Sequence, residues 1–175
     1  MKVSAGIYKG RKLVENKYEH IRPTADLVKQ ALFNTIAIKL SGARVLDLFA
    51  GTGALGIEAL SRGAQEVVFV DKDNRSVKLI KQNLDSLDVE AQVLCKDFSL
   101  AIKLLSGRQF DIILIDPPYK KGLYEKVLSL IEEGKLLADG GVIVCEHAKE
   151  DKIDPLTFEI TNEKRYGTKM LTFLQ

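Results

Sequence analysis

The sequence has few of the residues that build metal centres and disulfides. It contains no tryptophan, two cysteines, two histidines and four prolines among 175 residues. Cys95 and Cys145 lie far apart, each in an apolar run, which predicts two reduced thiols buried in strands. His20 and His147 also stand alone, so we expect them at the surface or in loops. No Cys or His spacing indicates a metal site.

Long apolar runs are absent as well. The longest are of strand length, well short of a membrane span, and the first residues contain no apolar signal core. We therefore expect a cytoplasmic protein that contacts no membrane. The length suits one domain with a sizeable core, so residues 1–175 are predicted to form a single domain.

The net charge is small but unevenly distributed. The formal value is +2, whereas residues 1–44 contain nine Lys and Arg side chains against three acidic ones, and the remainder has an excess of acids. A basic N-terminal segment on a mildly acidic body is typical of a protein that contacts a polyanion. A solvated charge run gives the same count, so the pattern alone is weak support.

The N-terminal residues form a segment of their own. Residues 3–14 contain two short apolar stretches around Lys9 and Gly10, which predicts a β-hairpin. Thr24 is a predicted helix N-cap, and apolar residues at helical spacing follow it as far as Gly42. We therefore divide the domain into a basic hairpin arm, residues 1–22, and a core, residues 23–175.

The core alternates strands and helices. Helices are expected at residues 54–62 and 74–87 and between the later strands. The predicted strands are residues 44–49, 66–71, 92–95, 110–116, 142–146, 157–161 and 170–174. Near-continuous apolar strands separated by amphipathic helices are typical of a parallel sheet covered on both faces. The last two strands have no helix between them, which predicts an antiparallel hairpin at one edge of a three-layer, Rossmann-like α/β sandwich.

A glycine-rich turn follows the first predicted strand. Residues 51–56 read GTGALG, which satisfies the G-x-G-x-x-G pattern, and Asp71 ends the next strand. The same pattern is a dinucleotide fingerprint, so an NAD enzyme is one interpretation. Asp47 argues against NAD, because the dinucleotide motif normally has an apolar residue at that position in the strand. A carboxylate there suits a cationic ligand group, such as the amino group of S-adenosylmethionine.

Other candidate ligand groups follow later strands. Ligands of such sheets bind beyond the carboxyl ends of the strands. Asp71 can accept both hydroxyls of a ribose, and Asp97 with Phe98 offers an acceptor and an aromatic face to an adenine. Turn glycines and a core Phe98 are the purely structural alternative. Three acids after successive strands, beside a glycine loop, favour a ligand site.

The fourth predicted strand ends in the sequence DPPY, residues 116–119. Consecutive prolines donate no hydrogen bonds and keep the backbone extended. The turn therefore presents acceptors, the Asp116 carboxylate and the Pro117 carbonyl. When they accept both hydrogens of an exocyclic base amine, its conjugated lone pair is drawn toward a tetrahedral nucleophile, and Tyr119 can stack on the base. A turn that only ends a strand is the structural alternative.

These motifs together resemble a known family. Residues 47–53 and 116–119 are similar to class I S-adenosylmethionine-dependent methyltransferases that modify amino groups. With residues 5–13, 22–24 and 49–63 they resemble the RsmD family, whose members methylate guanine N2 in small-subunit ribosomal RNA. The resemblance covers nearly the whole chain.

The resemblance implies a seven-stranded sheet, S-adenosylmethionine as donor with S-adenosylhomocysteine as product, and 16S ribosomal RNA in a partly assembled 30S subunit as substrate. Nothing in the sequence demands a dimer, so a monomer without a metal is expected. The implied cofactor residues are Asp47, Phe49, Gly51 and Gly53 for the methionine part, Asp71 for the ribose, and Asp97 and Phe98 for the adenine.

The flipped guanine is assigned to Asp116, Pro117 and Tyr119. The further candidate substrate contacts are Lys9, Arg11, Lys12, Arg22, Thr24, Lys120 and Lys121. Solvated side chains are an equal alternative for the lysines of the arm. Glu146, which ends the fifth predicted strand, has two interpretations, a pocket residue or a buried structural pair.

Four other functions fit parts of the pattern. A DNA methyltransferase acting on adenine N6 or cytosine N4 would use the same turn, but the chain has no insertion large enough for a sequence-reading domain. Protein glutamine methylation is chemically similar, and the basic arm favours RNA over it. Asp47 and residues 116–119 disfavour an NAD-dependent oxidoreductase. The intact reactive turn disfavours a non-catalytic binding module.

Overall fold

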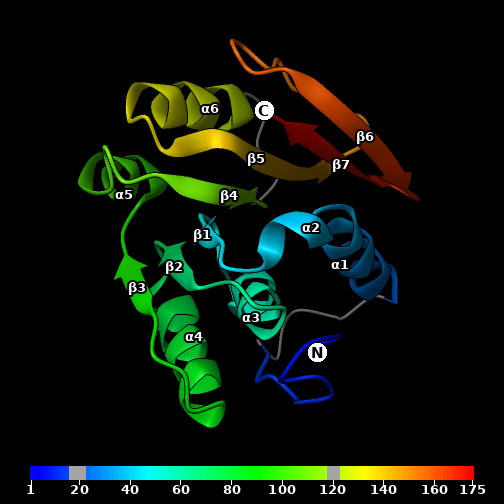
Figure 1. Cartoon of the computed structure of the whole chain (residues 1–175), viewed down its shortest axis with the longest axis vertical. Helices are drawn as coiled ribbons and strands as arrows, with labels where there is room; N and C mark the ends of the chain where they lie inside the picture. The colour runs from blue at the N-terminus through cyan, green and yellow to red at the C-terminus, as the bar shows by residue number, and fades with distance from the viewer. Residues whose placement is uncertain (16–22, 118–122) are drawn as a thin grey trace.

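A seven-stranded sheet forms the centre of the molecule in the computed structural model, which describes residues 1–15, 23–117 and 123–175. The strands are β1 (Arg44–Asp47), β2 (Glu66–Asp71), β3 (Gln92–Cys95), β4 (Phe110–Ile115), β5 (Leu137–Ala148), β6 (Ile160–Tyr166) and β7 (Lys169–Leu174). Their order is β3-β2-β1-β4-β5-β7-β6 (Figure 1). The first five strands run parallel, and β7 is antiparallel to β5 and β6. The predicted fold class is confirmed.

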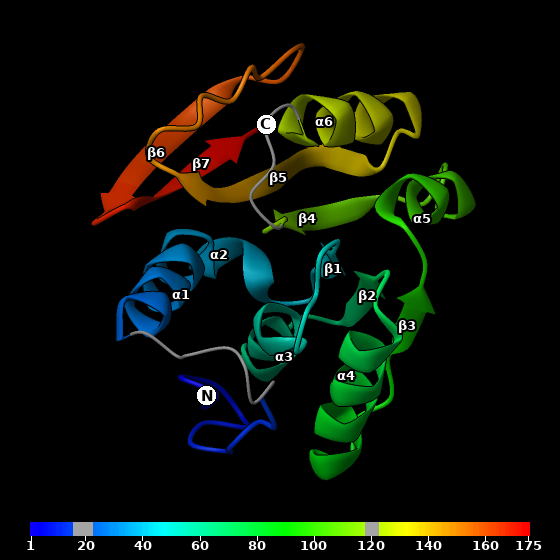
Figure 2. The same cartoon turned by 180° about the vertical axis from the view of Figure 1, so that it is seen from behind.

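Helices cover both faces of the sheet (Figures 1 and 2). They are α1 (Pro23–Thr35), α2 (Ala37–Leu40), α3 (Ala54–Ser61), α4 (Asn74–Ser86), α5 (Phe98–Leu104) and α6 (Leu123–Glu133). Buried side chains of α1 to α4 pack in one hydrophobic cluster with Val45 and Leu114. Those of α5 and α6 pack in a second cluster with Leu46 and Ile113. Alternating residues of the central strands thus serve opposite layers, as period-2 geometry requires.

Several predicted boundaries were wrong. β6 runs over Ile160–Tyr166 rather than residues 157–161, because this edge strand is largely exposed and has no apolar pattern. The predicted helix up to Gly42 is interrupted at Ile36, which separates α1 from α2. α1 begins at Pro23, so Thr24 lies inside the first turn and not at the cap. Proline is favoured at the first helical position because the N–H group that it lacks would have no partner within the helix there.

The cysteine and histidine predictions were partly wrong. Cys145 is buried as expected, but Cys95 is exposed because it ends the edge strand β3. His147 is buried in β5, where its ring nitrogens lie 2.8 Å from the Thr172 hydroxyl and 2.9 Å from the Ala148 carbonyl oxygen. His20 lies outside the described residues.

Two absences hold for the described part of the chain. It contains no group of three or more His, Cys, Asp or Glu side chains arranged to hold a metal ion. None of its helices is both long enough and apolar enough to cross a membrane.

The N-terminal arm is less regular than a hairpin of two strands. Its residues pair antiparallel at one isolated bridge between Lys2 and Lys12, supported by a hydrogen bond from the Val3 N–H to the Arg11 carbonyl. The arm is instead held by hydrogen bonds to α3 and α4, and it lies beside these helices (Figure 2). The turn prediction around Lys9 and Gly10 is confirmed only in outline, because the bend spans residues 5–10.

Candidate cofactor and substrate site

Three carboxylates lie together at the carboxyl edge of the central strands. Asp47 ends β1 and is in register with Phe69 of β2 and Leu114 of β4. Asp71 and Asp116 each follow two residues after those partners, on neighbouring strands. Residues two apart on a strand share a face, and ideal strand spacing would put the Cα atoms of Asp47 and Asp116 about 8 Å apart. The predicted cofactor residues Asp47 and Asp71 and the first residue of the DPPY sequence therefore belong to one side of the sheet.

The glycine loop between β1 and α3, together with the first turn of α3, needs glycine at three positions. Gly51 and Gly53 have φ angles of 55° and 80°, in the left-handed region that side chains disfavour. Gly56 lies inside α3, where an added Cβ would sit 2.2 Å from a ring carbon of Phe69. Close packing of helix on strand thus explains the third glycine, whereas backbone conformation explains the first two.

Asp47 contacts the first turn of α3, directly after this loop. It is 2% exposed, and its Oδ2 accepts the backbone N–H of Gly56 at 2.9 Å. Burial raises the pKa of Asp47 to about 7, with the negative charge of Asp71 acting in the same direction and the Gly56 hydrogen bond against it. Within the described residues, the groups around Asp47 therefore do not compensate the cost of burying its charge.

Asp71 joins the end of β2 to the glycine loop. Its Oδ2 accepts the Gly51 N–H at 2.9 Å, and its Oδ1 accepts the Asp73 N–H at 2.8 Å. Each carboxylate oxygen has more than one acceptor site, so these two bonds leave capacity for two hydroxyl groups. The position and chemistry of Asp71 fit a ribose diol.

Asp97 and two aromatic rings form the next part of the same edge. Asp97 caps α5 by accepting the Ser99 N–H at 3.0 Å and the Ser99 hydroxyl at 2.7 Å. The Ser99 hydroxyl bond, above all, lowers the pKa of Asp97, so the side chain is a carboxylate at neutral pH. Phe98 is half-buried and lies 5.5 Å from Phe49 between ring centroids, at an angle of 41°. Together they offer a purine an apolar face and an acceptor.

The DPPY sequence, residues 116–119, is described only up to its first proline. Asp116 is half-buried and Pro117 is buried. Arg22, Tyr119, Lys120 and Lys121 lie outside the described residues, and so does the side chain of Thr24.

A contact that the sequence did not reveal joins the start of α6 to the end of β5. Tyr124, in the first turn of α6, is buried and donates its hydroxyl to the Glu146 carbonyl at 2.7 Å. Because Ile115 pairs with Cys145, Glu146 is the neighbour of Asp116 across the strands. The Glu146 carboxylate forms an ion pair with Lys169, as the structural interpretation expected, while its role as a pocket residue stays a prediction. A tyrosine on an amphipathic helix carries no signal that predicts this role.

The basic residues separate into internal and exposed ones. Lys29 is buried and bonded to the Lys2 carbonyl, and Arg44 pairs with Asp111 at the opposite edge of the sheet. Lys9 and Lys12 are exposed, whereas the guanidinium of Arg11 donates to the Ser86 carbonyl at the end of α4. Part of the N-terminal charge therefore stabilises the fold.

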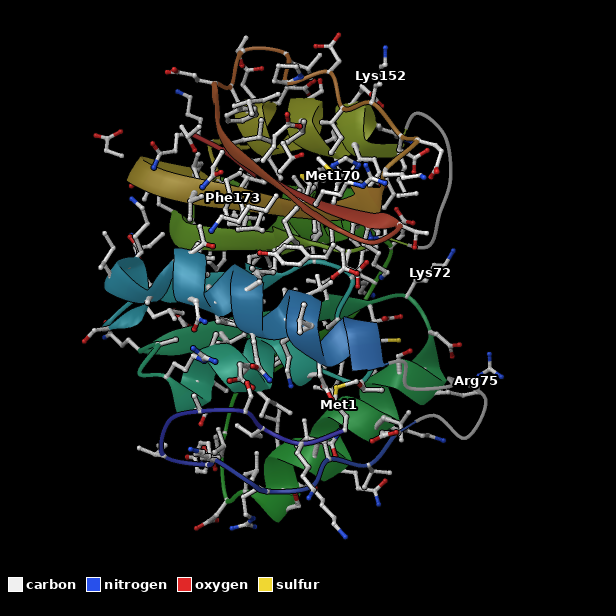
Figure 3. All side chains as sticks on the ribbon, turned by 90° about the vertical axis from the view of Figure 1, so that its right-hand side faces the viewer. Met1, Lys72, Arg75, Lys152, Met170 and Phe173 are labelled. Atoms are coloured by element: carbon white, nitrogen blue, oxygen red, sulfur yellow. The ribbon has the colours of Figure 1, made fainter. Side chains whose placement is uncertain are left out.

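Two more exposed cations lie at the cofactor edge. Figure 3 shows Lys72 and Arg75 extending outward just beyond β2. Arg75 makes an ion pair with Asp73 at 2.8 Å, although its side chain is 87% exposed. The sequence patterns did not single out either residue.

Known proteins resemble the chain over nearly its full length. The profile of the family described as Conserved hypothetical protein 95 matches residues 1–175. The Bacillus subtilis protein YlbH is 40% identical over 173 residues, covering 95% of this chain and 94% of YlbH. Ribosomal RNA small subunit methyltransferase D of Haemophilus influenzae is 34% identical over 172 residues, covering 95% of this chain and 89% of that protein.

Solved structures share the fold. The Escherichia coli protein yhhF superimposes with a TM-score of 0.90 at 32% identity, covering 100% of this chain and 97% of that one. The 16S rRNA N2 G1207 methyltransferase RsmC of T. thermophilus, solved with AdoMet and guanosine, gives a TM-score of 0.72 at 27% identity. That match covers 91% of this chain and 44% of the other. The chain therefore belongs to the Conserved hypothetical protein 95 family, which is the RsmD family that its motifs predicted.

Proposed function

We propose that this protein transfers a methyl group from S-adenosylmethionine to the N2 amine of a guanine in 16S ribosomal RNA. The observation that carries the proposal is the parallel pairing of β1 with β4, because the glycine loop follows β1 and Asp116 follows β4 at the same end of the sheet. Relatives named as small-subunit rRNA methyltransferases support an RNA substrate. The guanosine in the RsmC complex supports guanine N2 as the target.

The residues at the carboxyl ends of the strands fit the cofactor in their chemistry. Asp71 would hold the ribose, Asp97 and Phe98 the adenine, and Phe49 with the glycine loop the methionine part. Asp47 would balance the ammonium charge. S-adenosylmethionine supplies an electrophilic methyl group on a sulfonium, so no metal is needed in the proposed reaction.

The contribution of the chain to the reaction is to align the nucleophile. The Asp116 carboxylate and the Pro117 carbonyl would accept hydrogen bonds from the two N–H groups of the guanine amine. This would free the nitrogen lone pair to attack the methyl group. Tyr119 stacks on the flipped base. As the N–C bond forms, the sulfonium S–C bond would break and release S-adenosylhomocysteine, and the methylated nitrogen would lose its proton to the Asp116 carboxylate or to solvent. Much of the acceleration then comes from alignment, because holding two reactants in an attack geometry removes a large entropic barrier.

The substrate is proposed to be a partly assembled 30S subunit. The arm, residues 1–22, would contact RNA phosphates through Lys9, Arg11 and Lys12, while residues 23–175 carry the catalytic core of the same domain. Arg22, Thr24, Lys120 and Lys121 would border the base pocket. The protein would act as a cytoplasmic monomer, since shape recognition of folded RNA requires no second subunit.

The test is methyl transfer from labelled S-adenosylmethionine to undermodified small subunits, free 16S RNA and duplex DNA in parallel. The labelled product is digested and identified as a nucleoside. N2-methylguanosine from a ribosomal substrate is the expected result, and comparison of subunits with free RNA shows whether bound proteins are needed. Label in methylated adenine or cytosine of DNA would overturn the substrate, and transfer only to protein glutamine would overturn the nucleic-acid assignment.

A further inference from the structure

A buried amide connects the N-terminal arm to the glycine loop. Asn83 of α4 is 0% exposed. Its Oδ1 accepts the Val14 N–H at 2.6 Å, and its Nδ2 donates to the Val14 carbonyl at 3.1 Å and to the Thr52 carbonyl at 3.0 Å. Thr52 lies between the two left-handed glycines of the loop. One side chain therefore holds both polar groups of an arm residue and one peptide of the loop.

The same arm is fixed at its other end to α3, the helix that the glycine loop begins. Glu58 accepts hydrogen bonds from the Ser4 N–H at 2.8 Å and from the Ser4 hydroxyl at 2.6 Å. Ser61 donates its hydroxyl to the Ala5 carbonyl at 2.5 Å and accepts the Tyr8 N–H at 3.0 Å. These contacts do not touch the loop between β1 and α3, so Asn83 is a different kind of link.

The loop peptide that Asn83 holds is also constrained by the proposed ligand site. The Gly51 N–H is bonded to Asp71, and the Gly53 N–H to the Ala50 carbonyl at 2.7 Å. Ile80 of α4 lies 3.3 Å from the position of a Cβ on Gly53, so α4 also packs against the loop. Any ligand that fixes the peptides of residues 51–53 therefore fixes the acceptor that orients the Asn83 amide.

We propose that Asn83 is a positioning residue that couples cofactor binding at the glycine loop to docking of the N-terminal arm. Cofactor bound at the glycine loop strengthens the hydrogen bonds from Asn83 that hold Val14. The arm, with Lys9 and Lys12, is therefore ordered before it meets a polyanion. By thermodynamic linkage, docking of the arm favours the cofactor-bound loop by the same factor. The inference rests on the proposed function for the identity of the two ligands.

Hydrogen exchange of the Val14 amide tests the coupling in the unaltered protein. S-adenosylhomocysteine is the probe, and NMR at saturating ligand is expected to slow exchange of this amide at least about fivefold. Val14 exchange that is unchanged at saturation would overturn the coupling while leaving the cofactor assignment intact. Absence of S-adenosylhomocysteine binding to the wild-type protein would overturn both.

A matched pair of variants separates coupling from general loss of stability. Asn83→Ala is expected to weaken S-adenosylhomocysteine binding about tenfold, the equivalent of one buried hydrogen bond. Ser61→Ala also removes a polar anchor of the arm, but it leaves the Asn83 link in place and should keep the affinity within about twofold. Equal loss of affinity in the two variants would show that arm docking matters only through stability and would reject a positioning role for Asn83.

Discussion

Replacing Asp47 by asparagine is expected to stabilise the protein at alkaline pH and to weaken its affinity for the cofactor. Asp47 is buried, and its pKa is raised from 3.8 to about 7. Between these values the folded chain keeps a proton that the unfolded chain has lost. Stability from the neutral form is therefore complete below about pH 4 and is lost as pH rises toward 7. An asparagine side chain cannot ionise, so the variant escapes this loss while its amide oxygen can still accept the Gly56 N–H.

The size of the effect follows from the pKa difference. The unfolding free energy of the variant relative to wild type should rise by about 1.4 kcal/mol per pH unit between pH 4 and 7, to at most about 4 kcal/mol. Urea unfolding of both proteins at several pH values between 5 and 8 measures it. Asp139→Asn, which changes an exposed carboxylate at the other edge of the sheet, is the control and should show no such trend. A wild-type-to-variant difference that does not change with pH would refute the reasoning.

The affinity for the cofactor should change with pH in the opposite direction to the stability of the wild-type protein. If the ionised Asp47 balances the ligand ammonium, calorimetry should find S-adenosylhomocysteine bound about tenfold more weakly at pH 6 than at pH 8, because most of the carboxylate is protonated at pH 6. The Asp47→Asn variant should bind more weakly throughout and without this pH dependence. Equal pH dependence in both proteins would assign the titration to another group.

Three further sets of substitutions test the residues proposed to act on the guanine amine and the N-terminal arm. Asp116→Ala should remove most turnover but leave S-adenosylhomocysteine affinity nearly unchanged in calorimetry; parallel loss of both would contradict its role at the amine. Tyr124→Phe removes the bond to the Glu146 carbonyl and should lower kcat about tenfold with little change in KM for the cofactor; an unaltered kcat would show that the turn needs no such anchor. Replacing Lys9, Arg11 and Lys12 together by alanine should weaken RNA binding more at low salt than at high salt in a filter-binding titration; no salt dependence would discard the arm as a phosphate contact.

The fold and the acidic residues near the carboxyl ends of the parallel strands were predictable because they follow from local patterns. Buried parallel strands have continuous apolar runs, and ligand residues follow directly after them. Asp47, Asp71 and Asp116 could thus be placed at one edge from the sequence alone. The predicted bounds of the exposed edge strand β6 were wrong for a related reason. A strand with no buried face has no apolar pattern to detect.

The links between segments were not predictable from sequence. Asn83 lies on an amphipathic helix, and its partners Val14 and Thr52 are distant along the chain. An amide inside a helix reads as a solvated residue unless the element that covers it is known. The arm itself was interpreted as a basic extension, whereas Glu58 and Ser61 hold it through its backbone groups, which carry no sequence signature.

The two buried acids near the glycine loop differ in how the fold treats their charge. Burial opposes ionisation of Glu58, but hydrogen bonds from Ser4 and Arg62 and the charge of Lys29 outweigh it and lower its pKa. For Asp47, the Gly56 backbone donor is outweighed by burial and by a neighbouring carboxylate, so its pKa is raised instead. A charge that the fold balances serves the fold, as Glu58 does by holding the arm. A buried carboxylate that the fold leaves under-compensated costs stability, and we propose that a cationic ligand supplies the positive charge that the fold withholds from Asp47.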